Sequence, residues 1–303
     1  MCTGPSRGFI VVGVDDRPES LNAARYAIDL ARASGLCVRL LHAYGSIIGY
    51  GQYGVLHAGR MERTARAIID RVAAELEVPD GQCVERVVDG RSPVDALTAA
   101  GSDARCVVIG RRDRQRAPRL VRGQVASRLS GKAPVPIITV PASWRQPERP
   151  SRPVVIGLDG RTRARRPLAF AFTFAEQMGV GLEVVHVIDH DGEPIDRGDD
   201  RAAISQILTQ WRARHPTVAV DVQIVRGAAV ETLTRFSAEA SLLVVGKSYE
   251  YPGFGVWVGA LGCAVLKQSS CPVAIVPQVL ADTHGAVTRT GDDAAPIDTS
   301  ARS

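Results

Sequence analysis

Two loops bounded by glycines are the stretches of this sequence best suited to bind a ligand. Gly110 ends an apolar run and Gly123 opens the next helical pattern thirteen residues later, and Gly246 and Gly259 repeat that spacing in the second half. The first turn of a helix leaves backbone N–H groups unpaired, and these groups together with the helix dipole favour an anion such as phosphate. Glycines that only permit turns explain one copy equally well. Two copies at matched spacing favour a phosphate site, or the remnant of one.

The first of these loops is strongly basic. Six arginines and one aspartate between Arg111 and Arg122 give it +5, which equals the formal net charge of the whole chain. Such a loop could neutralise a triphosphate or bind RNA phosphates, and a solvated basic loop is the alternative. The loop offers no aromatic residue to stack on a base, so we expect no nucleic-acid partner.

The second loop is apolar and aromatic instead. Its large residues are Tyr249, Tyr251, Phe254, Val256, Trp257 and Val258. A patch of this kind is more typical of a protein interface than of a cofactor site. We therefore expect a homodimer and a further protein partner, which the sequence does not identify.

Carboxylate and imidazole side chains recur at corresponding places in the two halves. Asp15 and Asp159 each follow the first apolar run of their half. A carboxylate there could bond a ribose or an adenine edge, or equally could cap a turn or a helix. His42 and His186 have no Cys, Asp or Glu nearby at metal-ligand spacing, and we predict packed, hydrogen-bonded histidines rather than catalytic ones.

Motifs of nucleophilic and metal-dependent catalysis are missing. The chain has no G-x-S-x-G elbow between a strand and a helix, no G-x-x-x-x-G-K-[S/T] and no H-E-x-x-H. We therefore expect no enzymatic activity, no catalytic residue and no metal-ligand set.

Apolar runs typical of strands alternate with helical patterns in both halves, which predicts parallel sheets with right-handed crossovers. In the first half we expect strands near residues 9–14, 38–43, 83–88, 106–109 and 135–140, and helices near 20–33, 61–76, from 93, and 125–130. In the second half we expect strands near 154–159, 183–187, 218–225, 243–246 and 271–277, and helices near 165–178, 202–214 and 230–240.

The matching order of motifs indicates a tandem duplication. We divide the chain into a first domain at 1–145, a proline-rich linker at 146–153, a second domain at 154–280 and a disordered tail at 281–303. The length of 303 residues suits two such domains.

Composition indicates the cellular location and the state of the cysteines. The chain has no run of eighteen apolar residues and no apolar signal-peptide region at its start, so we expect no membrane segment and a cytoplasmic location. Its six cysteines include no C-x-x-C pair, and we predict buried thiols rather than disulfides or zinc ligands.

Taken together, these motifs resemble the universal stress protein family in the two-domain form that is common in actinobacteria. The resemblance covers residues 9–277. It rests on the runs Val11–Asp15 and Val155–Asp159, the strand ends Leu41–Ala43 and Val185–Val187, the turn Asp89–Pro93, the closing run Cys271–Pro277 and the two glycine loops.

This resemblance implies two five-stranded parallel sheets with strand order 3-2-1-4-5, helices on both faces, and a ligand crevice at the carboxyl ends of strands 1 and 4. It also implies that ATP is held by the motif G-x-x-G-x9-G-[S/T], with the aspartate after the first strand near the base and ribose. The candidate nucleotide-binding residues are then Asp15, Ala43, Gly110, Asp113, Gly123 and Gln124 in the first domain, and Asp159, Val187, Gly246 and Gly259 in the second.

Both motifs differ from this consensus at the same two places. Asp113 and Gln124 stand at the middle glycine and the Ser/Thr of the first domain, and Tyr249 and Ala260 stand there in the second. Aspartate tolerates a left-handed backbone and glutamine keeps a polar amide, so we expect the first domain to be the binding one.

Our leading interpretation is a cytoplasmic, non-enzymatic stress-response regulator that binds an adenine nucleotide, ATP with or without magnesium. A nucleotide-free protein-interaction scaffold is the alternative.

Overall fold

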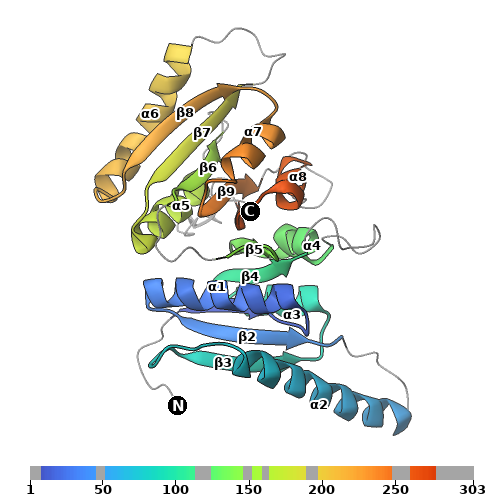
Figure 1. The fold of residues 1–303 in the computed structure, drawn as a ribbon. Helices are drawn as coiled ribbons and strands as arrows, with labels where there is room; N and C mark the ends of the chain where they lie inside the picture. The colour runs from blue at the N-terminus through green and yellow to red at the C-terminus, as the bar shows by residue number, and fades with distance from the viewer. Residues whose placement is uncertain are drawn as a thin grey trace, which may run out of the picture.

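The computed structural model describes residues 8–45, 52–112, 124–145, 152–158, 164–188, 197–247 and 260–277. The first half contains β1 (Phe9–Gly13), α1 (Pro18–Ser34), β2 (Cys37–Ala43), α2 (Gln52–Ala74), β3 (Val84–Asp89), α3 (Pro93–Gly101), β4 (Ala104–Arg111), α4 (Gln124–Lys132) and β5 (Ile137–Pro141). The second half contains β6 (Val154–Leu158), α5 (Arg165–Met178), β7 (Leu182–Ile188), α6 (Arg197–Arg214), β8 (Val220–Arg226), α7 (Ala229–Phe236), β9 (Leu242–Lys247), α8 (Ala260–Gln268) and β10 (Val273–Pro277). The expected alternation of strands and helices is confirmed in both halves (Figure 1).

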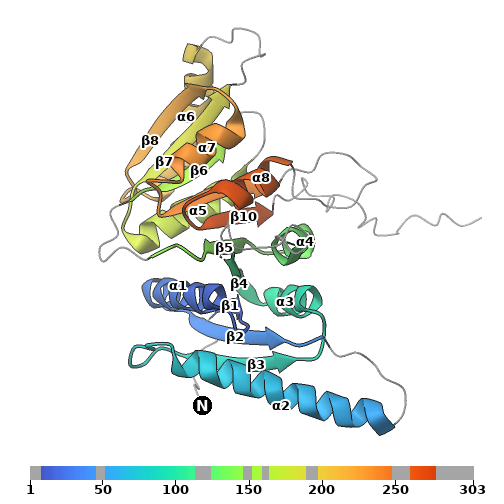
Figure 2. The ribbon, with the colours of Figure 1, turned by 45° about the vertical axis from the view of Figure 1, so that its right-hand side comes forward.

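The strands form one continuous ten-stranded sheet in the order β3-β2-β1-β4-β5-β10-β9-β6-β7-β8 (Figures 1 and 2). Within each half the order is the expected 3-2-1-4-5, and β1, for example, pairs parallel with both β2 and β4. The expectation of two separate sheets is wrong, because β5 and β10 pair antiparallel with Ile138 opposite Ala274. Both of these strands are buried along their whole length, so each would otherwise leave an unpaired apolar edge.

Helices cover both faces of this sheet (Figure 2). In the first half α1 and α2 pack on one face, and α3 packs with α4 on the other. The side chains of β1 alternate to match, since Ile10 and Val12 join the α1 cluster whereas Val11 joins the cluster of α3 and α4. In the second half α5 packs with α6 and α7 packs with α8.

Local chemistry sets several helix ends. Gly35 follows α1 with φ 66° and Gly179 follows α5 with φ 64°, which is the left-handed conformation that commonly ends a helix. The Ser92 hydroxyl accepts a hydrogen bond from the Asp95 N–H and Pro93 takes the first helical position, so α3 begins at the expected residue. In contrast, α2 begins at Gln52, well before the expected residue 61, because its first turns extend beyond the sheet and need no apolar stripe (Figure 2).

The two halves pack against each other as a pseudo-dimer. α1 contacts α5, and the larger hydrophobic cluster continues across the β5–β10 junction. The Asn22 amide in α1 donates to the carbonyls of Pro141 and Trp144 at 3.0 and 2.9 Å. On the other face, Ser127 Oγ in α4 lies 3.9 Å from Cys263 Sγ in α8. These two residues are 136 positions apart, the same separation as Gly110 and Gly246, so they occupy corresponding places in the two halves.

The prediction of buried thiols is confirmed for three of the five cysteines in the described part of the chain. Cys37, Cys106 and Cys271 are buried, Cys83 and Cys263 are half-buried, and none of the five forms a disulfide. Burial raises the pKa of the Cys106 and Cys271 thiols to about 12. Among the described helices, none has the length and apolar character needed to cross a membrane.

Candidate functional site

Three of the predicted site residues meet at the carboxyl edge of the first half. β1 lies between β2 and β4, and its register sets Gly13 beside Leu41 on one side and beside Ile109 on the other. Asp15, just beyond β1, therefore lies level with Ala43 at the end of β2 and close to Gly110 in β4. The connection from β1 leads to β2 on one side, whereas β4 lies on the other side of β1, so the strand order reverses there. Open α/β sheets bind ligands at such a switch point.

Asp15 takes part in a tight turn after β1. Its Oδ1 accepts the Arg17 N–H at 3.1 Å, and its Oδ2 lies 3.4 Å from the Arg17 guanidinium. The Ser20 hydroxyl accepts the Asp15 N–H and lies within donating distance of the carbonyls of Asp15 and Arg17. The turn role considered for Asp15 is therefore present, and its side chain is still 38% exposed.

The two histidines hold the strand ends. His42 Nδ1 lies 2.7 Å from the carbonyl O of Val14, and His186 Nδ1 lies 2.8 Å from that of Leu158. Both rings are buried, so the ring N–H satisfies a carbonyl that would otherwise lack a partner. The prediction of packed, hydrogen-bonded histidines is confirmed.

Gly110 is required by the packing of α1. A Cβ at this position would lie 2.3 Å from the carbonyl O of Glu19 and 2.9 Å from the Ser20 backbone N. The first turn of α1 thus passes directly over the end of β4. The structural explanation for this glycine applies whether or not a phosphate binds nearby.

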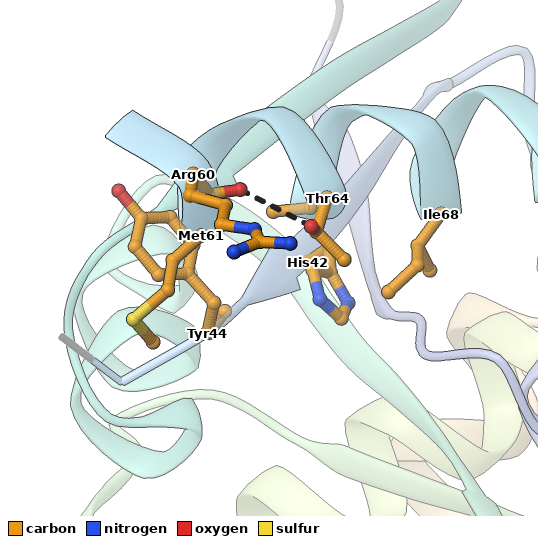
Figure 3. Close-up of a pocket in the computed structure, with 8 residues that line it drawn as sticks. His42, Tyr44, Arg60, Met61, Thr64 and Ile68 are labelled. Carbon is orange, nitrogen blue, oxygen red and sulfur yellow. Dashed lines mark hydrogen bonds between the residues drawn. The ribbon is translucent and has the colours of Figure 1, made fainter. Parts of the chain in front are cut away.

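A hollow of about 470 Å³ lies beside Ala43, between the end of β2 and the helix α2. Its lining residues are His42, Ala43, Tyr44, Arg60, Met61, Thr64, Ala65 and Ile68. Figure 3 shows the side chains of Thr64 and Ile68 on α2 near the His42 ring and that of Met61 beside Tyr44, with the Thr64 hydroxyl donating to the Arg60 carbonyl at 3.1 Å. The lining is apolar with a cation and a phenol at its rim. No sequence motif marks these α2 residues as a site, because they resemble ordinary positions of an amphipathic helix.

The first two arginines of the basic loop have protein partners. Arg112 Nε bonds Glu19 Oε1 at 2.7 Å, and the carboxylate is only 15% exposed. Arg111 Nη2 donates to the carbonyl of Ser269 in the second half. These two residues therefore do not form the open anion-binding patch that the charge count predicted, and the other four arginines lie outside the described residues.

The end of β3 and the turn after it lie at the same carboxyl edge of the sheet. Hydrogen bonds from Arg91 hold the pKa of the Asp89 carboxyl below its usual value. The Tyr44 N–H donates to the Asp89 carbonyl and the Gly45 N–H to the Arg91 carbonyl, so the chain after β2 is tied to the turn after β3.

In the second half the corresponding place is acidic. His186 Nε2 lies 3.8 Å from Asp200 Oδ2 on α6, where α2 in the first half presents apolar side chains to His42. Val187 lies in β7 and Gly246 in β9, on either side of β6. The next residue, Lys247, points its Nζ to the Gly131 carbonyl of the first half at 2.7 Å.

The remaining predicted positions lie outside the described residues, namely Asp113, Gly123, Asp159, Tyr249 and Gly259. Gln124 and Ala260 are the first residues of α4 and α8. In both halves a helix thus begins directly after the second glycine of the loop, as the sequence predicts.

An open, doubly wound sheet with polar residues and a hollow at its carboxyl edge has the architecture in which many α/β proteins bind ligands. The sequence profile of the Universal stress protein family matches residues 8–141 and 150–277. The chain belongs to the universal stress protein family.

The chain is also similar to individual proteins, in sequence or in fold. A universal stress protein of Mycolicibacterium smegmatis is 28% identical over 283 residues, which cover 88% of this chain and 96% of the relative. The crystal structure of a universal stress protein from Archaeoglobus fulgidus DSM 4304 superposes with a TM-score of 0.67 at 18% identity, covering 89% of this chain and 98% of that one. A universal stress protein solved in complex with cAMP matches only 41% of this chain, with 25% identity, 95% coverage of its own length and a TM-score of 0.33.

Proposed function

We propose that this chain is a cytoplasmic, non-enzymatic stress-response regulator that binds one adenine nucleotide, ATP, in its first half. The observation that carries the proposal is a hollow beside Ala43 at the same carboxyl edge that carries Asp15 just beyond β1, with α4 starting directly after the second glycine of the loop. The volume of the hollow lies within the range of about 300–1,000 Å³ that is usual for small-molecule sites.

The residues at this edge would suit the base, the ribose and the phosphates of a nucleotide. The apolar side chains of Met61 and Ile68 suit a flat purine, and the backbone of Ala43 offers polar groups to its edge. The exposed part of the Asp15 carboxylate suits a ribose hydroxyl. The phosphates would lie toward the start of α4, where the helix dipole favours an anion.

The second half is the weaker candidate. Asp200 places a carboxylate beside His186, where the first half has the hollow, and a charged group there suits an apolar purine less well. Ala260 also offers no polar group at the start of α8. We therefore propose that each chain binds one nucleotide, that two chains form a homodimer, and that a protein partner recognises the nucleotide-bound form.

The first experiment is mass spectrometry of the ligand released from freshly purified, denatured protein, followed by calorimetry with ATP. We expect about one nucleotide per chain. The Asp15→Ala variant should lose it and the Asp159→Ala variant should keep it. Because Asp15 also forms a turn, Asp15→Asn, which keeps the acceptor for the Arg17 N–H, separates loss of the turn from loss of the charge.

The hollow is tested by Met61→Asp, which places a carboxylate in the apolar lining of the hollow. We expect ATP affinity to fall by about tenfold or more, a change of about 1.4 kcal/mol in binding free energy. Ala67→Asp is the matched control, because Ala67 is exposed on the same helix outside the hollow and the substitution adds the same single negative charge. Equal losses in both variants would show only a general effect of charge, and two equal sites per chain would overturn the choice of the first half.

The alternative is a nucleotide-free interaction scaffold. It is favoured by the engagement of Arg111 and Arg112 with protein groups, which leaves less positive charge for phosphates. No co-purified nucleotide and no binding at millimolar ATP would establish this alternative. Steady ATP turnover that is lost in Asp15→Ala would instead show an enzyme.

A further inference from the structure

The last residue of each glycine-bearing strand reaches into the opposite half. Arg111 ends β4 directly after Gly110 and donates to the carbonyl of Ser269, which directly follows α8. Lys247 ends β9 directly after Gly246 and donates to the carbonyl of Gly131 in the last turn of α4. Each contact joins the strand end of one glycine loop to the C-terminal end of the helix that follows the other loop.

The Lys247 contact is made away from water. The residue is only 3% exposed, and burial lowers the pKa of its amine to about 8. The last carbonyls of a helix have no donor within the helix and form the negative end of its dipole. The Gly131 carbonyl is one of these groups, so the ammonium of Lys247 both satisfies it and stabilises the helix end.

The helix that Lys247 holds is the one that begins at the first half's candidate phosphate site. α4 is 9 residues long, and at about 1.5 Å per residue its two ends are roughly 13 Å apart. A helix of this length moves as a unit. Fixing the Gly131 end against β9 therefore also fixes where its first residue, Gln124, stands relative to Gly110.

We propose that Lys247 of the second half is a positioning residue for the phosphate end of the first half's nucleotide site, an inference that rests on the proposed function. The second half then contributes to nucleotide binding without holding a nucleotide itself. Arg111 makes the reverse contact, but it belongs to the first half's own loop, so the Lys247 contact allows the cleaner experiment.

The experiment is ATP calorimetry on the full chain and three variants. Lys247→Met keeps the length of the side chain and removes the donor, and we expect it to weaken ATP binding by about tenfold, within the usual range for coupled sites. Lys247→Arg keeps a cation that can reach the carbonyl and should restore most of the affinity. Lys267→Met is the matched control, since Lys267 is exposed in the last turn of α8, and it should leave affinity unchanged.

A second measurement covers the case in which Lys247→Met does not fold. Amide hydrogen exchange of the Asp159→Ala chain should show that ATP slows exchange in β9 as well as in α4. Unchanged affinity in Lys247→Met, failure of Lys247→Arg to restore it, or protection confined to the first half would overturn the inference and leave the proposed function standing. A wild-type chain that binds no ATP would overturn both.

Discussion

Gly110 and His42 show how closely packing and a binding site share the same residues. The glycine admits the first turn of α1 over β4, and the histidine satisfies the carbonyl that precedes Asp15. The two functions are compatible, because the packed groups lie beneath the edge where a ligand would sit. The sequence indicated the histidines' role from their place at strand ends, but it could not show that Gly110 faces α1, because that contact joins residues far apart in the chain.

Gly110→Ala is therefore expected to destabilise the fold whether or not nucleotide is present. Its Cβ would lie 2.3 Å from the Glu19 carbonyl O, and backbone cannot move aside as a side chain can. We expect urea denaturation to show a loss of about 3 kcal/mol or more in the free energy of unfolding. Gly59→Ala is the control, because nothing lies within 4 Å of a Cβ there, and this exposed helical site should gain about 0.5–1 kcal/mol. Similar values for the two variants would contradict the close approach of α1.

Corresponding strands of the two halves carry opposite charge patterns. On β2 and β3, Arg39 faces Glu85 in register and bonds it at 2.8 Å. On β7 and β8, Glu183 faces Asp221 in register, so two carboxylates are neighbours. Burial, and then the charges of Asp221 and Glu239, raise the pKa of Glu183.

Glu183→Gln is expected to stabilise the protein at pH 7. Since the folded-state pKa of Glu183 is raised, its contribution to stability is present below the unfolded-state pKa of about 4.3 and is lost as pH rises through the folded-state pKa. The gain from Gln should therefore vanish near pH 4 and reach about 0.2–1 kcal/mol at pH 7, the range for partly exposed cross-strand pairs.

Urea denaturation at both pH values measures this gain. Glu85→Gln is the matched substitution in the first half, where it removes the partner of Arg39 and should destabilise at pH 7. A loss of stability in both variants would argue against repulsion between Glu183 and Asp221.

Regular elements were the most predictable part of the fold. α5 runs over the expected residues 165–178, because its apolar stripe is continuous and Gly179 ends it. The start of α2 was not predicted, because its first turns lie beyond the sheet, where a helix needs no apolar period to pack against a core. The hollow beside Ala43 was missed for a related reason, since only the crossing of α2 over β2 brings Met61 and Thr64 to that place. The contact between Lys247 and Gly131 spans 116 positions and left no local pattern to detect.

The molecule as a whole is organised by the antiparallel junction of β5 and β10. Only three residue pairs make up this ladder, yet the hydrophobic cluster, the α1–α5 contact and the Asn22 hydrogen bonds all cross it. A short ladder with so much packing around it should not separate before the halves unfold.

We therefore expect both halves to unfold in one cooperative transition. Trp144 reports on the first half and Trp211, which stacks on Phe172, reports on the second. In urea, fluorescence of a chain that keeps only Trp144 and of one that keeps only Trp211 should give the same midpoint, with Trp257 replaced by Phe in both. Two distinct midpoints, after correction for each variant's stability by circular dichroism, would mean that the halves unfold independently.

The pairing of Ser127 with Cys263 has a redox consequence. The two residues occupy corresponding places on α4 and α8, with Oγ and Sγ 3.9 Å apart. In a dimer of two identical single-domain chains, a cysteine at this place would meet a second cysteine, and an oxidant could join the subunits through a disulfide. Fusing the two copies into one chain allows each to carry a different residue there. A thiol opposite a hydroxyl cannot form that cross-link, so this contact between the halves is insensitive to oxidative coupling even when the surroundings become oxidising.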